Sequence, residues 1–106
     1  MLKFLIKKIQ RKGQKTYRRK IGKIRFDIYA PQASNVELVG CFNSWMPGQH
    51  IMKKERDGFW KTYVMLCSGK YEYKFIVDNK WEIDPENSKT VIMDNGTINS
   101  VKKVDI

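Results

Sequence analysis

The sequence predicts an all-β protein, a sandwich of two sheets. Apolar and polar residues alternate along much of residues 24–104, which is typical of strands that bury one side. About seven such runs recur at intervals of roughly 8 to 12 residues, separated by turn-forming residues, as in sandwich domains. The chain has 106 residues, 42% of them hydrophobic, which suits one core but not several domains. We therefore expect a single sandwich domain.

A basic arm precedes the predicted sandwich, so we divide the chain into residues 1–21 and residues 22–106. Ten of the 21 Lys and Arg residues lie within residues 1–23, which hold no Asp or Glu. The remaining residues carry eleven basic and eleven acidic side chains, so the net charge of +10 belongs to the arm. Apolar residues recur in the arm at the spacing of one helical face: Leu2, Leu5, Ile6 and Ile9.

Lysines interrupt the apolar residues of the arm too soon for a secretory signal, and the segment is too short to span a bilayer. A helix of two turns is marginal alone, so the arm either docks on the domain or stays solvated, or it forms a helix on a membrane surface or partner. Contact with nucleic acid is a further alternative, because phosphates attract such a charge run. We expect a cytoplasmic protein, since the two cysteines also show no paired spacing.

Three strands are expected in the first half of the sandwich. Residues 24–30 alternate between apolar and polar side chains. Their apolar side consists of Ile24, Phe26, Ile28 and Ala30. A turn containing Pro, Ser and Asn leads to an apolar run at residues 36–41. Residues 51–55 form a short pairing segment after the loop at residues 43–49.

Four strands are expected in the second half. An Arg-Asp-Gly turn leads into residues 59–66. The apolar side of this strand consists of Trp60, Thr62, Val64 and Leu66. In residues 71–78, one side consists of Tyr71, Tyr73, Phe75 and Val77, and the other of Glu72, Lys74 and Ile76. An Asp-Asn turn precedes residues 81–83, and residues 97–104 form the last strand.

No residue pattern indicates catalysis or a cofactor. The chain has no G-x-S-x-G turn and no glycine-rich phosphate loop. Asp84 and Glu86 are best explained as solvated loop acids, and no nucleophile stands beside His50 in the sequence. Together with Cys41 and Cys67, His50 lacks the spacing of a zinc site. We therefore expect neither an enzyme nor a metal site.

The three tryptophans differ in their surroundings. Trp60 belongs to the apolar side of a predicted strand, so we expect it in the core. Trp45 and Trp81 stand among polar residues at a loop and at a strand end. An exposed indole offers a flat platform for the C–H face of a sugar ring or for a nucleobase, and packing at the sandwich edge is the alternative. The residues themselves therefore indicate a binding module with an aromatic platform.

Three motifs follow one another along the chain: VELVGCFNSW at residues 36–45, YKFIVDNKW at residues 73–81 followed by Asp84-Pro85, and NGTINS at residues 95–100. They resemble the motifs of the family-48 carbohydrate-binding modules. These isoamylase N-terminal-like domains include the glycogen-binding domain of the AMP-activated protein kinase beta subunit. The resemblance spans roughly residues 22–104. It implies an immunoglobulin-like early-set β-sandwich that binds α-1,4-linked glucans such as glycogen, starch and malto-oligosaccharides.

The resemblance also assigns roles to particular residues. It implies that Trp45 and Trp81 stack on sugar rings and that Lys74 and Asn99 bind sugar hydroxyls. Alternation supports Lys74, which lies on the side of its strand opposite the apolar Tyr73 and Phe75. Further contacts are expected from neighbouring residues: Asn43, Asn95 and Thr97.

Two positions depart from the pattern of the kinase-type module. Asn95 stands where the kinase-type module has an apolar residue before its Gly-Thr pair, and Ser44 stands where that module has an asparagine. Weaker glucan binding is therefore expected. The alternative to glucan binding is a regulatory sandwich that docks a partner enzyme or kinase through a sheet edge. A nucleic-acid module that combines the basic arm with the tryptophans is less well supported, because the sandwich itself is neutral.

Overall fold

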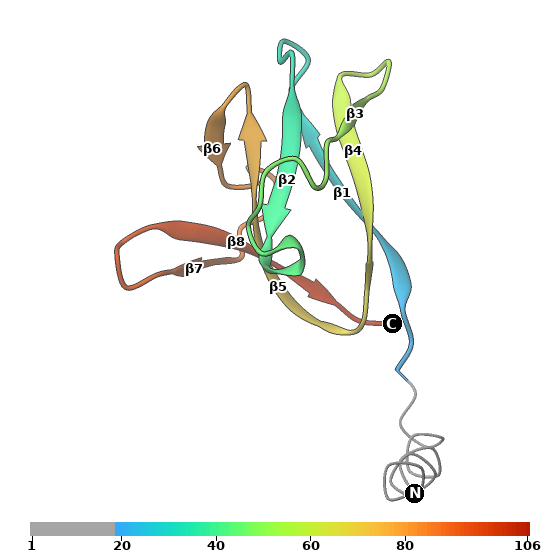
Figure 1. Ribbon diagram of the computed structural model, residues 1–106, viewed down its shortest axis with the longest axis vertical. Coiled ribbons are helices and arrows are strands. Elements are labelled where there is room, and N and C mark those ends of the chain that lie inside the picture. Colours follow the sequence, from blue (N-terminus) through green and yellow to red (C-terminus); the bar gives the residue numbers. More distant parts are fainter. Residues whose placement is uncertain (1–18) are drawn as a thin grey trace, which may run out of the picture.

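The computed structural model describes residues 19–106, and its regular structure is almost entirely β (Figure 1). The helix expected around residues 2–9 lies outside the described residues. Within residues 19–106, no helix reaches the length and apolar character needed to cross a membrane. The strands are β1 (Gly22–Tyr29), β2 (Val36–Gly40), β3 (Lys53–Lys54), β4 (Phe59–Leu66), β5 (Gly69–Val77), β6 (Lys80–Glu82), β7 (Thr90–Ile92) and β8 (Ile98–Val104).

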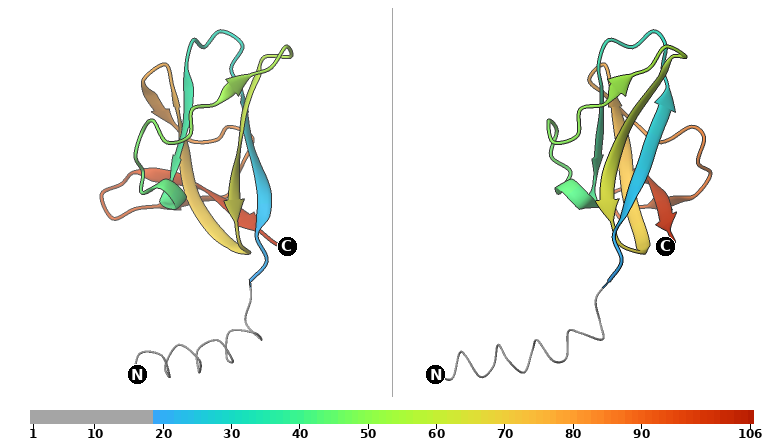
Figure 2. Two further views of the ribbon diagram at one scale, coloured as in Figure 1. Left: turned by 45° about the vertical axis from the view of Figure 1, so that its right-hand side comes forward. Right: turned by 90° about the vertical axis from the view of Figure 1, so that its right-hand side faces the viewer.

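Two antiparallel sheets pack face to face, which confirms the predicted immunoglobulin-like β-sandwich (Figure 2). The smaller sheet has the strand order β1-β4-β3, and the larger has the order β2-β5-β8-β7, with β6 also paired to β5. A short turn at Cys67 and Ser68 carries the chain from β4 in one sheet to β5 in the other. Strand β5 pairs with β2, β6 and β8, so most of the larger sheet is assembled on it.

The core lies between the sheets and consists of the apolar sides predicted for the strands. Its buried residues are Phe26, Ile28, Val36, Leu38, Met52, Trp60, Val64, Leu66, Tyr73, Phe75 and Val104. Trp60 is 7% exposed, and its Nε1 donates to the carbonyl oxygen of Ala30 at 2.9 Å. The core position expected for this tryptophan is confirmed.

The buried phenol of Tyr73 connects the core to the segment before β7. Its hydroxyl donates to Asp84 Oδ2 at 2.7 Å and accepts from Asn87 Nδ2 at 3.0 Å. Burial raises the pKa of the Tyr73 phenol well above its ordinary value; the bond to Asp84 acts in the same direction and the bond from Asn87 opposes it. Asp84 N also donates to Ser100 Oγ at 2.8 Å. These bonds attach residues 84–87 to β5 and β8.

The turn between the two sheets also holds both ends of the described chain. Arg19 Nη2 donates to the carbonyl oxygen of Ser68 at 3.1 Å. Ser68 Oγ accepts from the backbone N–H of Ile106 at 3.0 Å and donates to the Ile106 carbonyl at 3.1 Å. The entry to β1 and the exit from β8 therefore lie at the same end of the sandwich (Figure 1).

Three details differ from the sequence predictions. The edge strand β7 was not expected, because three residues are too few to show an alternation. Cys41, expected in the second strand, begins a 3-10 turn, Cys41–Asn43. Ile76, expected on the open side of its strand, is only 6% exposed, because β6 places Trp81 directly beside it.

Candidate functional site

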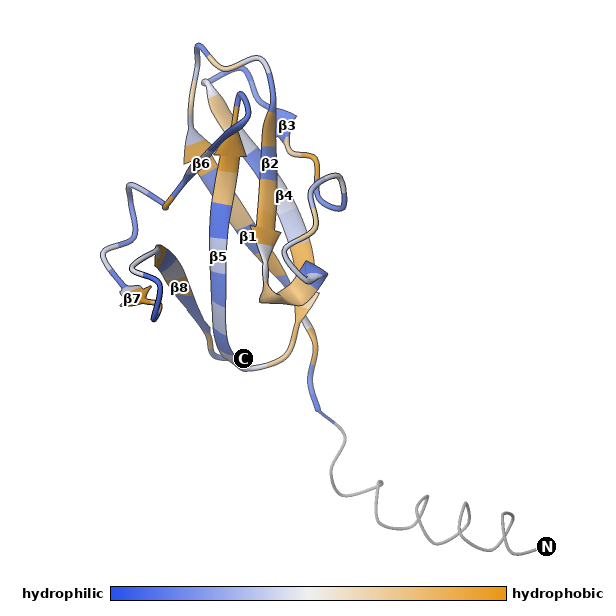
Figure 3. Ribbon diagram, turned by 60° about the vertical axis from the view of Figure 1, so that its left-hand side comes forward, coloured by the Kyte–Doolittle hydropathy of each residue, from blue (hydrophilic) through white to orange (hydrophobic). Residues whose placement is uncertain are grey.

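The outer face of the larger sheet brings together residues that are distant in sequence. Strand alternation turns Lys74 of β5 away from the core. Trp81 of β6 pairs with Ile76, which is two residues further along the same face. Asn99 of β8 stands one position beyond the last β5–β8 pair, Tyr73 with Ser100, and therefore next to Lys74. Figure 3 shows hydrophilic stretches in both β5 and β8.

Trp45 reaches the same face from the loop after β2. The side chain of Asn43 shapes this loop: its Oδ1 accepts from Gly40 N at 3.0 Å, and its Nδ2 donates to the Leu38 carbonyl at 3.1 Å. The amide orientation is thus fixed, so the contact of Nδ2 with His50 Nδ1 at 2.9 Å makes that ring nitrogen an acceptor. Asn43 therefore acts on the loop that carries Trp45.

The backbone of the loop is strained at the tryptophan. Ser44 and Trp45 have φ angles of 56° and 58°, a left-handed conformation that non-glycine residues rarely adopt and that costs about 1–3 kcal/mol. The backbone N–H of Trp45 donates to the Gly40 carbonyl at 2.9 Å. Such strain persists only where the surrounding structure enforces it. In this loop, the strained residues lie where the chain turns Trp45 toward the sheet.

Gly40 is required by close packing at the start of this loop. A Cβ at Gly40 would lie 2.6 Å from the carbonyl oxygen of Glu72 and 2.7 Å from the ring of Phe42. The loop therefore presses directly against the backbone of β5.

The β7–β8 turn supplies the remaining wall of the site. Met93 N donates to the Thr97 carbonyl at 2.8 Å, and Gly96 has a φ of 89°. Asn95 Oδ1 accepts from Thr97 N at 3.1 Å and from Thr97 Oγ1 at 2.7 Å. These bonds close the turn and place three of its side chains beside β5 and β6.

An open pocket of about 220 Å³ lies where these segments meet. Its lining consists of Trp45, Lys74, Trp81, Met93, Asn95, Thr97 and Asn99. Six of the seven residues named from the sequence thus line one pocket. Asn43 does not line it, because its amide is engaged in the loop. Met93 was missed, since no sequence feature distinguishes it from a core methionine.

The pocket residues differ in exposure. Trp81 is 50% exposed, whereas Asn99 is only 8% exposed. Asn99 Nδ2 donates to Glu72 Oε1 at 3.0 Å. Because a carboxylate only accepts, the amide oxygen of Asn99 is the atom that remains to accept from a ligand.

The lining of the pocket suits binding. It offers two indole platforms, one ammonium, two amides and one hydroxyl, and none of its residues is an Asp, Glu, His or Cys. Within residues 19–106, no group of three or more His, Cys, Asp or Glu side chains could hold a metal ion. An aromatic platform beside hydrogen-bonding groups suits a ring that is apolar on its face and polar at its edge, as sugars are.

Fold and site together define a β-sandwich binding domain with an aromatic pocket on one sheet. The sequence profile of carbohydrate-binding module 48 (isoamylase N-terminal domain) matches residues 12–95, and the chain belongs to this family. The resemblance seen in the three motifs is thereby confirmed.

Similar proteins include two plant proteins and a bacterial enzyme. Protein PTST homolog 2, chloroplastic, of Arabidopsis thaliana is 43% identical over 58 residues, which are 55% of this chain and 11% of that protein. Protein FLOURY ENDOSPERM 6, chloroplastic, of Oryza sativa subsp. japonica is 34% identical over 77 residues, 73% of this chain and 14% of that protein. The 1,4-alpha-glucan branching enzyme GlgB of Vibrio parahaemolyticus is 42% identical over 55 residues, 52% of this chain and 7% of the enzyme.

Among solved structures, the fold is similar to part of a maltogenic amylase from S. marinus. The TM-score is 0.68 at 26% sequence identity, and the match covers 84% of this chain and 14% of the amylase. In all of these comparisons the chain spans only a small part of the matched protein, between 7% and 14% of its length.

Proposed function

We propose that the sandwich is a non-catalytic module that binds α-1,4-linked glucans, namely chains of glycogen or starch and malto-oligosaccharides. One observation carries the proposal: three separate segments with the motifs of a carbohydrate-binding family line a single pocket. The relatives support the choice of glucan, since one is named a 1,4-alpha-glucan branching enzyme and another a maltogenic amylase.

In the proposed complex, the indoles of Trp45 and Trp81 stack on the apolar faces of glucose rings. The Lys74 ammonium donates to sugar hydroxyls, and the free amide oxygen of Asn99 accepts from one. The lining contains one charged side chain, Lys74, and no acid, so Lys74 is free to donate to the hydroxyls of a neutral sugar.

Asn95 is the member of the pocket that weakens the proposed binding. Its side-chain oxygen already accepts two hydrogen bonds from Thr97, so it contributes less to a ligand than its type suggests. An amide also offers less apolar surface than the residue found here in the kinase-type modules. We therefore expect modest affinity for short chains.

The experiment is a calorimetric titration of the full chain with maltoheptaose at two salt concentrations, with tryptophan fluorescence as a second readout. We expect saturable binding with almost no salt dependence, because the ligand carries no charge. Cellohexaose, whose β-1,4 linkages give a differently shaped chain, is the matched control and should bind more weakly. Absence of maltoheptaose binding would reject the proposal.

A role as a docking domain for an enzyme is the second candidate. The relatives favour this role. The matched segment is a small part of each of these long proteins, and one of the proteins is an enzyme. We propose that such docking would leave the pocket open and use other surfaces. A variant with an altered pocket should then still bind its partner enzyme, as measured by co-purification. Loss of both activities in that variant would contradict separate surfaces.

The roles considered for the basic arm stay predictions, as does a cytoplasmic location. Deletion of residues 1–20 is expected to abolish salt-sensitive adsorption to anionic lipid or nucleic acid and to leave maltoheptaose binding intact. Vesicle sedimentation and the titration above measure the two properties. Loss of sugar affinity on deletion would show that the arm is part of the sandwich.

A further inference from the structure

A second hollow lies on the outer face of the larger sheet, beside the pocket lined by Trp45 and Trp81, here called the tryptophan pocket. It has a volume of about 530 Å³ and is lined by Lys70, Glu72, Lys89, Thr90, Val91, Val101 and Lys103. Glu72 joins the two hollows, because it lines this one and accepts a hydrogen bond from Asn99, which lines the other. Lys70, Glu72 and Lys74 alternate along β5, so the two ends are separated by about 13 Å of strand.

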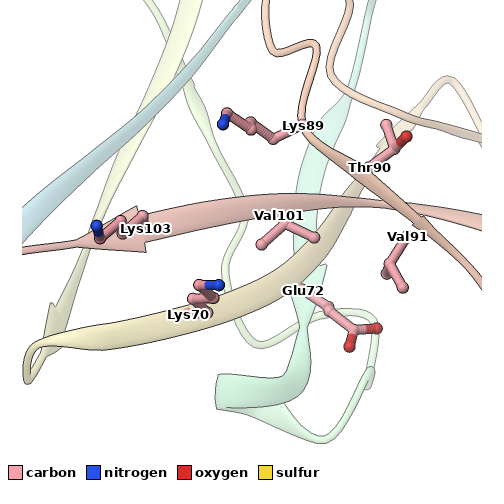
Figure 4. A pocket seen from close by; sticks show the side chains of 7 residues that line it. All are labelled: Lys70, Glu72, Lys89, Thr90, Val91, Val101 and Lys103. Atoms are coloured by element: carbon pink, nitrogen blue, oxygen red, sulfur yellow. The ribbon is translucent and has the colours of Figure 1, made fainter.

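Three lysines border this hollow, and Figure 4 shows Lys70, Lys89 and Lys103 on one side of Val101 and Val91 on the other. Glu72 is the direct cross-strand partner of Val101. Lys70 and Lys103 are direct cross-strand partners between β5 and β8. Like charges in this arrangement destabilise a sheet, so the fold gains nothing from the pair.

None of these three lysines forms a salt bridge within residues 19–106. The salt bridges among residues 19–106 are Arg25 with Asp27 and Lys61 with Glu55, both away from this hollow. Glu72, the one acid in the lining, keeps its negative charge while it accepts the amide of Asn99, so it offsets one of the three positive charges. The arm cannot supply another acid, since residues 1–23 contain no Asp or Glu. With three lysines and one glutamate, the lining of the hollow therefore carries a net positive charge next to a pocket suited to sugar rings.

We propose that this lysine cluster is an anion subsite for a phosphate ester carried on the same glucan chain that occupies the tryptophan pocket. Lysine binds phosphate as a mobile point charge with three donors, and Lys70 and Lys103 stand side by side on neighbouring strands with Lys89 in the same lining. The apolar floor of Val91 and Val101 supports the sugar ring that bears the ester. The inference rests on the proposed function, because the tryptophan pocket holds the rest of the chain.

The test compares maltoheptaose with maltoheptaose that bears one phosphate ester at a glucose C6 position, by titration of the full chain at low and moderate salt. We expect the phosphorylated chain to bind about fivefold to twentyfold more tightly at low salt, with the advantage shrinking as salt screens it. Equal affinity for the two chains would overturn the subsite. Failure to bind unmodified maltoheptaose would instead reject the proposed function, so the two failures are distinguishable.

Variants locate the effect. Lys70→Gln with Lys103→Gln should remove the preference for the ester and keep the affinity for unmodified maltoheptaose. Lys20→Gln with Lys53→Gln removes the same charge elsewhere and should keep the preference, which separates the subsite from attraction by the basic chain as a whole. Equal weakening of both ligands in the first variant would overturn the proposal in favour of a neutral sugar subsite.

Two further probes distinguish the sources of an anion. Free glucose 6-phosphate should bind the unaltered protein far more weakly than the phosphorylated chain, because it lacks the rings that reach the tryptophans. A polyglutamate peptide that bound through Lys70 and Lys103 as tightly as the phosphorylated chain would overturn the proposal in favour of a protein partner.

Discussion

The two faces of β5 follow the same alternation but serve different purposes. On the inner face, Tyr73 and Phe75 are at most 1% exposed and pack against Phe26 and Leu38. On the outer face, Lys74 and Glu72 remain partly accessible and border two hollows. The comparison teaches that the residues of the core and those of the proposed binding site are separated by a single residue step along the strand. Substitutions on the two faces should therefore affect different measurements.

The largest effect is expected on the inner side of the sandwich. Trp60→Ala should lower the free energy of unfolding by about 3–5 kcal/mol, because it empties a buried site and removes the hydrogen bond to Ala30. Chemical denaturation measures this loss. A stable Trp60→Ala protein that had lost maltoheptaose binding would reverse the assignment of inner and outer tryptophans.

Trp81→Ala should have the opposite profile. We expect a loss of about 1–3 kcal/mol of maltoheptaose affinity, by analogy with the stacking of bases on aromatic side chains. The loss of stability should be well below that of Trp60→Ala, because Trp81 is 50% exposed and only covers Ile76 from outside. Tyr29→Ala is the matched control, since Tyr29 is 56% exposed but belongs to the other sheet. Unchanged affinity in both Trp81→Ala and Trp45→Ala would exclude stacking.

Lys74 and Asn99 test the separation of binding from stability, because both line the pocket but only Asn99 is buried. Lys74→Met should cost about 1–3 kcal/mol of affinity without loss of stability. Asn99→Ala should cost a similar affinity and also stability, since it leaves Glu72 without its amide partner. Titration and denaturation of each variant give both quantities. Equal stability of the two variants would contradict a structural role for Asn99.

Tyr73 makes the inner face sensitive to alkali. Its folded-state pKa is raised by burial, so the folded protein retains the phenol proton above about pH 10, where the unfolded chain loses it. Stability should be unaffected by this group below pH 10 and should fall above it by at most about 1.4 kcal/mol per pH unit. Tyr73→Phe should be less stable at neutral pH, and the difference should shrink above pH 10. Parallel stability curves would contradict the buried neutral phenol.

The smallest effect concerns the loop that carries Trp45. Ser44→Gly relieves one left-handed residue and is expected to change the free energy of unfolding by less than about 1 kcal/mol, in the stabilising direction. Thermal unfolding and maltoheptaose titration measure the result. A Ser44→Gly protein that unfolds at a lower temperature would show that the added freedom of the unfolded chain outweighs the relief of strain at this position.

Local pattern was sufficient to predict most of the sandwich. The alternation in β1, β4 and β5 predicted the core side of each strand, and the three motifs predicted six of the residues that line the pocket. The role of Asn43 could not be predicted, because a loop asparagine can equally bind a ligand or hold its own backbone. Its three contacts are with residues up to seven positions away and depend on the folded loop.

Features that depend on strand register could not be predicted from the sequence. The bond from Asn99 to Glu72 joins residues 27 positions apart, and the facing of Lys70 and Lys103 follows from the β5–β8 pairing. A shift of one residue in that pairing would place different side chains on the outer face. The lysine cluster therefore becomes visible only once the two strands are aligned.

The contact of Ser68 with Arg19 and Ile106 has a consequence for protein engineering. Because one turn holds both ends of the described chain, a host protein could receive the sandwich as an insertion in a single surface loop, with short connectors. The same closeness would allow the ends to be joined and the chain reopened elsewhere. In either arrangement β6 and the β7–β8 hairpin would project away from the graft point (Figure 1), so the transplanted domain would keep its pocket facing solvent.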